Sequence, residues 1–247
     1  MKRISTLTLA LIMLFTLSAC SNNESPQSNN MPSSTSSETP EVIEESTPEN
    51  SDVDESAVSS NGGTKILIAY FSMPEDVLPD GVDAIAGASV VVKDDEVLGN
   101  TQYIAEIIQR TVGGDLFRIE TVQTYPAMHD GLLDFASEEL QNNARPELSS
   151  HVEDMDSYDV IFLGYPNWWA DLPMPLYTFL EEYDLSGKTI IPFCPHGGSG
   201  FSRTESTIAE LQPEAMVSEN SFTISRNNVA NGEIDVITWL ESLSFSE

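Results

Sequence analysis

Five short apolar runs alternate along the chain with five segments in which apolar residues recur at helical spacing. Each run ends at a polar or glycine-containing loop before the next helical segment begins. This alternation is typical of a doubly wound α/β fold, because parallel strands must be joined by crossover helices. The expected strands cover residues 65–71, 115–120, 159–164, 188–194 and 222–224.

The helical segments are placed by their apolar stripes and their capping residues. The first is expected over residues 101–111, the fourth reaches position 211, and the last covers 233–243. The second helix is expected to be capped by Asp130 and to have one apolar face, formed by Leu133, Ala136 and Leu140. Asp171 and Pro173 mark the start of the third helix, whose apolar stripe is Leu176, Phe179, Leu180 and Tyr183. Ser202 and Glu205 have capping-box spacing before the fourth helix.

The order of the strands decides where a ligand would bind. Right-handed crossovers make 2-1-3-4-5 the common arrangement, and the continuous apolar run 159–164 suits its buried centre. Pro192 fits the fourth strand poorly, because proline cannot donate a hydrogen bond to a ladder. The winding reverses between the first and third strands, so the loops that follow these two strands are expected to form the site.

The first 64 residues differ from the rest of the chain. Lys2 and Arg3 precede an apolar stretch, and the residues around Cys20 resemble a bacterial lipoprotein signal, which implies a signal peptide over 1–19 and a lipid on the Cys20 thiol. An ordinary signal peptide or a short membrane anchor is the alternative. Residues 20–64 are acidic and rich in Ser and Pro, which predicts a disordered tether between an extracytoplasmic lipid anchor and a domain over 65–247.

Acidic residues dominate this predicted domain. After position 64 the chain has 31 of its 40 acidic residues and 8 of its 10 basic ones, a formal charge of −23. Such a charge argues against binding nucleic acid or anionic lipid headgroups, and it serves either solubility outside the cell or the choice of a basic partner. Cys20 and Cys194 are the only cysteines, so lipidation of Cys20 would leave no disulfide within one chain.

Ser72 follows the first strand and the sequence Gly-Asn-Thr at 99–101 begins the first helix, with residues 73–98 inserted between them. Small hydroxyl and amide side chains at a helix N-terminus suit a phosphate held by neutral donors, although a simple helix cap explains the same residues. Within the insertion, two apolar segments flank positions 94–95 and predict a small hairpin over the site.

The loops after the third and fourth strands contain adjacent aromatic residues and several glycines. Trp168 and Trp169 would stack on a planar aromatic ligand, pack over helix ends or form a partner surface. The segment 194–201 reads CPHGGSGF, and its glycines allow the backbone to approach a flat ring. This segment lacks the final glycine of a nucleophile elbow, so Cys194 and His196 do not indicate a hydrolase.

The sequence lacks the residues that a receiver domain or a metal site would need at the expected positions. A phospho-accepting receiver domain requires acidic residues after the first strand and an aspartate after the third, where this chain has Ser72 and Gly164. The three histidines lie in separate segments without the spacing of metal ligands, so no metal site is expected at His129, His151 or His196.

The strand at 65–72, the segment 99–101 and the stretches GYPNWWADLPMP and FCPHGGSGFS together resemble the flavodoxin family over about residues 64–243. The resemblance implies bound FMN, with its phosphate at the first loop and its isoalloxazine ring between the other two. The cofactor-binding residues that it implies are Ser72, Met73, Gly99, Asn100, Thr101, Tyr165, Pro166, Asn167, Trp168, Trp169, Pro195, His196, Gly197, Gly198, Ser199, Gly200 and Phe201.

A protein of this family would transfer electrons through FMN without a catalytic side chain, and acidic groups near the ring would lower its potential. An NAD(P)H-dependent quinone or FMN reductase and a cofactor-free surface binding domain are the alternatives. The third loop lacks the tyrosine that often stacks on the outer flavin face, where His196 or Phe201 would substitute. We expect a monomer, held to the membrane only by its lipid, that meets a basic or membrane-bound redox partner.

Overall fold

The computed structural model describes residues 63–72, 90–93, 96–126 and 129–243. All of them belong to one compact unit, residues 57–247. The expected signal peptide, the tether, Cys20, Met73 and most of the insertion lie outside the described residues. No helix in the described part of the chain is long and apolar enough to cross a membrane.

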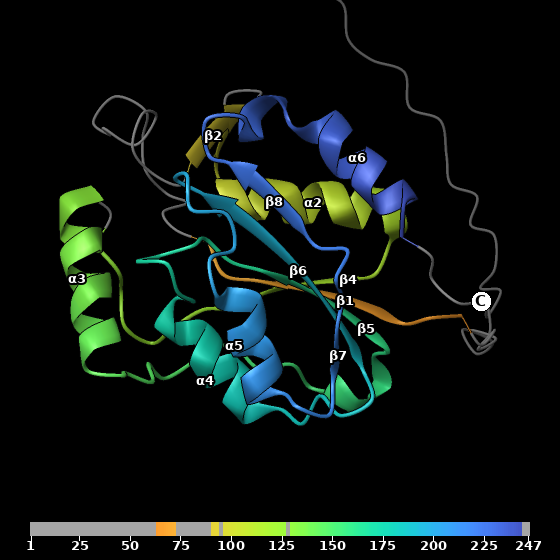
Figure 1. The fold of residues 1–247 in the computed structure, drawn as a ribbon, viewed down its shortest axis with the longest axis horizontal. Coiled ribbons are helices and arrows are strands. Elements are labelled where there is room, and N and C mark those ends of the chain that lie inside the picture. The colour runs from red at the N-terminus through yellow and green to blue at the C-terminus, as the bar shows by residue number, and fades with distance from the viewer. Residues whose placement is uncertain (1–62, 73–89, 94–95, 127–128, 244–247) are drawn as a thin grey trace, which may run out of the picture. The chain divides into compact units, whose positions relative to one another are not determined.

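The main sheet is parallel and confirms the predicted order of strands (Figure 1). β4 and β5 flank β1, β6 pairs with β5, and the last position is divided between β7 and β8, which both pair with β6. The order is therefore 2-1-3-4-5 with a fifth strand in two pieces. The strands are β1 (Ile66–Tyr70), β4 (Asp115–Arg118), β5 (Val160–Gly164), β6 (Thr189–His196), β7 (Met216–Val217) and β8 (Phe222–Ser225).

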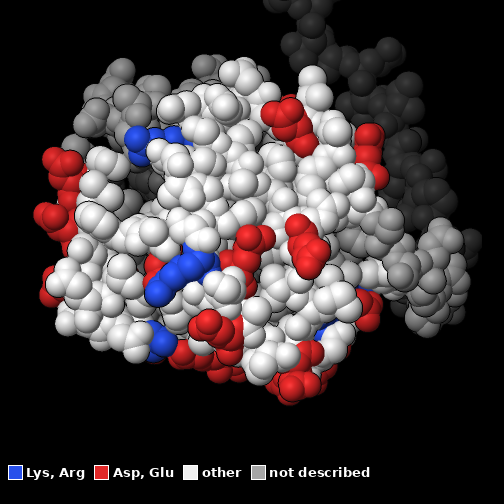
Figure 2. All heavy atoms as spheres, in the orientation of Figure 1, with Lys and Arg blue, Asp and Glu red and all other residues white. Residues whose placement is uncertain are grey.

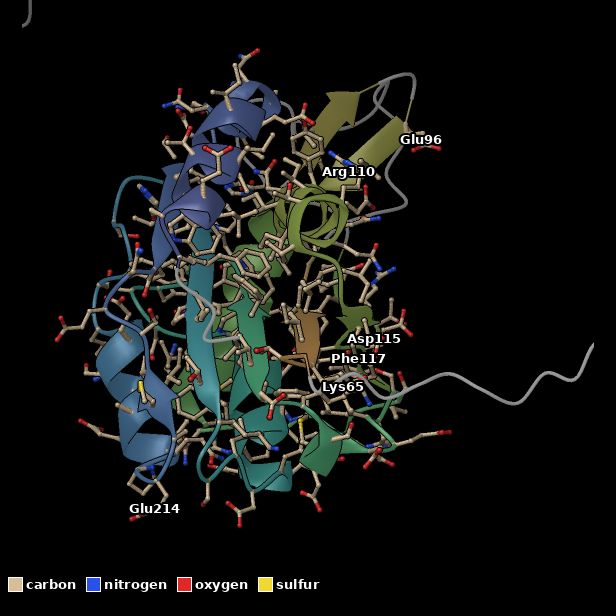
Figure 3. The ribbon with its side chains drawn as sticks, turned by 90° about the vertical axis from the view of Figure 1, so that its right-hand side faces the viewer. Lys65, Glu96, Arg110, Asp115, Phe117 and Glu214 are labelled. Carbon is tan, nitrogen blue, oxygen red and sulfur yellow. The ribbon has the colours of Figure 1, made fainter. Side chains whose placement is uncertain are left out.

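Helices cover both faces of this sheet. α2 (Asn100–Val112) and α6 (Glu233–Glu241) lie on one face, and α3 (His129–Gln141), α4 (Met174–Glu182) and α5 (Thr204–Leu211) lie on the other (Figure 1). Short 3-10 helices, η2 (Met155–Ser157) and η3 (Val229–Asn231), complete the connections. Figure 3 shows the β4 edge of the sheet, with Asp115 and Phe117 on the strand and Lys65 just before β1.

The central strand β5 is buried along its whole length, as its continuous apolar sequence predicts. Its side chains alternate between the two layers of the core. Ile161 and Leu163 pack in the cluster beneath α4 and α5, whereas Val160 and Phe162 pack in the cluster beneath α2 and α6. The sheet thus stabilises both helical layers, and it fixes the ends of the strands at one common edge.

Three details of the predicted helices are wrong. α3 begins at His129, so Asp130 lies in its first turn instead of capping it, and its buried face contains Leu132, whereas Leu133 is exposed. The third helix begins at Met174 with Pro173 as its N-cap, so Pro173 marks its start as predicted, whereas Asp171 lies three residues before the helix. Its predicted stripe is buried at Leu176, Phe179 and Leu180, with Tyr183 half-buried just after the helix.

The predicted capping box of the fourth helix does not form. α5 begins at Thr204, and Ser202 lies outside it in a left-handed conformation with φ of 55°. The Ser202 hydroxyl donates to the carbonyl of Ser199 at 3.2 Å, within the loop. A serine three residues before a glutamate is therefore used here to shape the loop that precedes the helix.

The divided fifth strand explains how β6 accommodates Pro192. The carbonyls of Ile190 and His196 accept hydrogen bonds from the amides of Ser218 and Arg226, both at 2.8 Å, so the backbone groups of even-numbered residues in β6 face β7 and β8. β7 pairs with β6 up to Ile190 and β8 pairs from Phe193 onward. Pro192 faces the gap between them, where no ladder donor is needed.

The insertion contains the predicted hairpin. β2 (Val90–Lys93) and β3 (Glu96–Gly99) pair in antiparallel register, and β3 leads directly into α2. Val91 is buried in the same cluster as the apolar faces of α2 and α6. The described part of the hairpin packs beside α2 and η3, and none of its residues lines the recess between the loops that follow β5 and β6. Its place over the site stays a prediction.

Candidate functional site

The loops after β1, β5 and β6 emerge at the same edge of the sheet, and a recess of about 120 Å³ lies between the last two. Parallel strands place their C-terminal ends together, and the winding of the sheet reverses here. The residues that line the recess are Asn100, His129, Leu132, Leu133, Ala136, Pro166, Asn167, Trp168, Trp169, Pro195, His196, Gly197 and Arg226.

The two halves of the predicted phosphate loop meet in the structure. Ser72 is buried, and its Oγ accepts a hydrogen bond of 3.4 Å from the amide of Gln102 in the first turn of α2. Thr101, the neighbour of Gln102, is also buried. The bond is long, so a better acceptor could compete for this amide. The structure thus brings Ser72 and Thr101 to one helix N-terminus, while the phosphate between them stays a prediction.

Two amide oxygens at the recess are buried without a hydrogen-bond donor among the described residues. They are the Oδ1 atoms of Asn100, the first residue of α2, and of Asn167, in the loop after β5. The Asn167 Nδ2 group donates to the Gly200 carbonyl at 2.8 Å and to the Ser202 hydroxyl at 3.2 Å, so this side chain also joins the second loop to the third. Buried acceptors are normally satisfied, so a ligand that brings donors fits this recess.

The adjacent tryptophans have different surroundings. Trp168 is half-buried and packs edge-to-face against Phe71, with 5.5 Å between ring centroids. Trp169 is 54% exposed, and its Nε1 group donates to the Leu133 carbonyl of α3 at 3.1 Å. Both line the recess, and both also pack on neighbouring elements, so stacking on a ligand and packing over α3 are compatible roles.

The backbone turn that presents the tryptophans is strained. Trp168 and Asp171 exchange two backbone hydrogen bonds, of 3.2 and 2.9 Å, around Trp169 and Ala170, whose φ angles are 53° and 62°. Left-handed conformations at two residues other than glycine cost about 1–2 kcal/mol each and persist only when neighbouring contacts hold them. Strain of this kind is common in loops that bind ligands.

A buried carboxylate holds the end of this turn. Asp171 is only 3% exposed, and its Oδ1 accepts hydrogen bonds from the amide of Leu172 and the hydroxyl of Tyr177, both at 2.9 Å. Its Oδ2 pairs with the guanidinium of Arg203, in the loop before α5. The ion pair and the Asn167 side chain therefore connect the two loops on either side of the recess.

Tyr165 is placed differently from the other residues of its loop. Its ring is fully buried in the core, and its hydroxyl donates to the Thr204 Oγ1 at 2.9 Å. Burial raises the pKa of this hydroxyl well above its ordinary value. Its side chain does not line the recess, whereas the next residue, Pro166, does.

The third loop contributes its first half to the recess. Pro195, His196 and Gly197 line it. The remaining predicted residues lie outside the lining, and Phe201 packs against the core instead of facing the recess. The loop backbone favours glycine at two of these positions, because φ is 132° at Gly198 and 59° at Gly200. The outer residues shape the loop, so the predicted set Gly198, Ser199, Gly200 and Phe201 is not part of the recess wall.

His196 has a defined tautomer. The amide of Gly198 donates to its Nδ1 at 2.9 Å, so in the neutral ring the proton is on Nε2. Partial burial lowers the pKa of the imidazole. The ring is therefore neutral at pH 7 and keeps one N–H group for a ligand.

Cys194 cannot serve as a nucleophile at neutral pH. Its side chain is fully buried, and burial raises the pKa of its thiol far above the ordinary value. Within the described residues no group of three His, Cys, Asp or Glu side chains could hold a metal ion.

Sequence reasoning missed five residues that line the recess: His129, Leu132, Leu133, Ala136 and Arg226. The first four belong to α3, which is joined to the site by no local motif in the sequence. Arg226 comes directly after β8. Ligands bind at the C-terminal ends of parallel strands, and the position of Arg226 at the end of the fifth strand is the signal in the sequence that points to it.

Comparisons with known proteins give a consistent result. The sequence model of a family described as flavodoxin matches residues 89–243. A candidate flavoprotein of Bacteroides eggerthii is similar at 28% identity, covering 74% of this chain and 99% of that one, with a TM-score of 0.55. A candidate flavoprotein of Bacteroides uniformis is 24% identical, covering 73% and 99%, with a TM-score of 0.55. Among curated proteins no relative matches the chain.

Proposed function

The chain belongs to the flavodoxin family, and on this premise we propose that it binds FMN at the recess and passes electrons through it to a redox partner. The observation that carries the proposal is that the amide oxygens of Asn100 and Asn167, at one recess, are buried without a donor among the described residues. FMN has an N–H group on its ring and hydroxyl groups on its ribityl chain, which are donors that could satisfy both oxygens.

Three groups of residues would hold the cofactor. Ser72, Thr101 and the first amides of α2 would bind the phosphate, because free N–H groups and the helix dipole favour an anion there. The tryptophan loop and the segment Pro195 to Gly197 would flank the ring. FMN supplies the electron-transfer chemistry, and the chain supplies its orientation and surroundings.

The side chains of the recess offer both apolar surface and N–H donors. Leu132 and Trp168 offer apolar surface, and His196 offers one N–H donor. The recess is smaller than the 300–1,000 Å³ typical of small-molecule sites, so a bound flavin extends beyond it and stays accessible at one edge. An accessible edge supports an electron carrier more than a reductase with an enclosed substrate site.

The location and the partner are also part of the proposal. The sequence around Cys20 supports a lipid anchor outside the cytoplasm, with residues 21–64 as the tether. Acidic side chains are distributed around the face drawn in Figure 2, and Lys and Arg are sparser there. A basic surface on the redox partner fits this charge.

Titration of the apoprotein with FMN, followed by quenching of flavin fluorescence, tests the function. We expect saturable 1:1 binding, weakened at least tenfold in Trp168→Ala, because Trp168 lies on the recess. Trp239→Phe is the matched control, since Trp239 packs between Phe162 and Phe222 in the other layer of the core. Absence of binding by the wild-type protein would exclude a flavoprotein and leave a cofactor-free binding domain. NADPH oxidation with a quinone would instead identify a reductase.

A further inference from the structure

A buried aromatic cluster supports one of the two tryptophans of the recess. Trp168 packs against Phe71, which directly follows β1, and against Tyr125, which lies in the segment between β4 and α3. Their ring centroids are 5.5 and 5.9 Å from that of Trp168, and Phe71 and Tyr125 are themselves in edge-to-face contact at 5.7 Å. Phe71 and Tyr125 are buried and outside the lining of the recess, so within this cluster Trp168 is the ring that reaches the site.

Helix α3 holds Tyr125 at two points. The hydroxyl of Tyr125 donates to Glu139, whose carboxylate oxygens lie 2.9 and 2.8 Å away, and the side-chain amide of Gln123 donates to the same carboxylate. The Tyr125 ring packs edge-to-face against Phe135, one helical turn before Glu139, with 5.1 Å between centroids. The hydrogen bond fixes the direction of the Tyr125 ring, and the contact with Phe135 fixes its plane.

The pair of Tyr125 and Glu139 is buried at a cost to stability. Their exposed fractions are 5% and 7%, and burial raises the pKa of both side chains, with the charge of Glu139 as a second cause at Tyr125. Two apolar side chains could fill this space without that cost. The benefit of the pair is a defined orientation of the Tyr125 ring, which apolar packing alone specifies less well.

The tryptophan loop depends on support of this kind. Trp169 and Ala170 follow Trp168 in left-handed conformations, which neighbouring contacts must hold. The Trp168 ring meets Phe71 at an interplanar angle of 84° and Tyr125 at 50°. A shift of Tyr125 therefore moves part of the surface on which Trp168 rests.

We propose that Tyr125 is a positioning residue of the FMN site: α3 holds it through Glu139 and Phe135, and it holds the Trp168 ring in the orientation that packs against the flavin. The inference rests on the proposed function and adds to it a residue that sets the affinity from outside the recess. Tyr125 transfers no proton or electron and acts only through Trp168.

The first variant is Tyr125→Leu, which removes the aromatic contact with Trp168. We expect its affinity for FMN to fall about fivefold, the magnitude typical of one aromatic pair. Tyr158→Leu is the matched control, because Tyr158 is also a buried tyrosine that donates to a carboxylate, that of Asp115 at 2.7 Å. It precedes β5, at the end of the sheet away from the recess, so this control should bind FMN as the wild type does.

Variants of Glu139 test the hydrogen bond. Both Tyr125 and Gln123 donate to its Oε1 atom, so Glu139→Gln keeps both bonds through its amide oxygen and should keep the affinity. Glu139→Leu removes the acceptor and should weaken FMN binding about threefold, the magnitude typical of one hydrogen bond. Equal affinities in these two variants would overturn the role of Glu139.

A double-mutant cycle with Trp168→Ala decides whether Tyr125 acts through Trp168. Equilibrium dialysis of the purified protein against FMN measures the affinities without depending on quenching by Trp168. In the Trp168→Ala background, Tyr125→Leu should change the affinity less than about 1.5-fold, because the ring that it positions is absent. An equal loss in both backgrounds, or no loss in either, would overturn the proposal and leave the proposed function intact.

A wild-type protein that binds no FMN would overturn both the positioning role and the proposed function. If Tyr125→Leu does not fold, Glu139→Leu is measured in the same two backgrounds. A loss that is confined to the chain with Trp168 then supports the proposal, and equal losses overturn it.

Discussion

Asp171→Asn should loosen the tryptophan turn and weaken FMN binding at the same time. The carboxylate of Asp171 is buried and accepts hydrogen bonds from the Leu172 amide and the Tyr177 hydroxyl. A hydrogen bond to a charged group contributes about 1 kcal/mol more than one to a neutral group, so two such bonds predict a loss of about 2 kcal/mol in the free energy of unfolding. For a domain of this size that lowers Tm by about 4–8 °C.

The effect on binding follows from the strain in the turn. Trp169 and Ala170 keep their left-handed conformations only while both ends of the turn are held, and Asp171 holds one of them through Tyr177 and Arg203. We therefore expect a weaker affinity for FMN beyond that caused by unfolding. Arg203→Gln should weaken binding in the same direction with a smaller loss of stability, because Arg203 is largely exposed.

Thermal unfolding followed by circular dichroism and FMN titration of the folded protein at 20 °C measure the two effects separately. Asp235→Asn is the matched control, since Asp235 is exposed on α6. If Asp171→Asn resembles this control in both Tm and FMN affinity, the carboxylate does not hold the turn and the reasoning is refuted.

Three further outcomes are expected. Gly164→Ala should cost about 1–3 kcal/mol of stability, because its Cβ would lie 2.1 Å from the ring of Phe193, and Phe193→Leu in the same chain should restore part of the loss in urea unfolding. Burial raises the pKa of Glu139, so the stability that the protonated side chain contributes is present below its ordinary pKa and is lost as the pH rises through the raised pKa. In urea unfolding, Glu139→Gln should therefore gain stability relative to the wild type from pH 4 to pH 7. A difference that stays constant over this range would contradict the prediction. Ser72→Ala should weaken FMN more than riboflavin in paired fluorescence titrations if Ser72 contacts the phosphate, and equal losses would exclude that contact.

The order of the strands was predictable because it depends on local periodicity and on general rules of handedness. The apolar run at 159–164 has to be central in any parallel sheet, and β5 confirms it. The meeting of Ser72 with the start of α2 was also predictable, because both ends of the insertion belong to one strand–helix junction. Such features require only the chain's own sequence of elements.

Other features depend on contacts between distant segments, which periodicity does not contain. Leu132 is buried and Leu133 is exposed, because the apolar residues of α3 are compatible with more than one rotation of the helix and packing against the core selects one. Ser202 bonds within its loop because Asn167, 35 residues earlier, also donates to its hydroxyl. Pro192 is tolerated because the fifth strand is divided opposite it. No Asp or Glu is among the described residues that line the recess of this acidic chain, because net charge does not determine local charge.

The most direct test of the central claim is a ¹⁵N-resolved NMR titration of the purified protein with FMN, which reports both binding and its location. We predict that the backbone amide of Gln102 and the side-chain amides of Asn100 and Asn167 shift with saturation at one equivalent, because they lie at the phosphate end and at the recess. Unchanged signals from these three groups would contradict the account, as would shifts confined to β7 at the opposite end of β6.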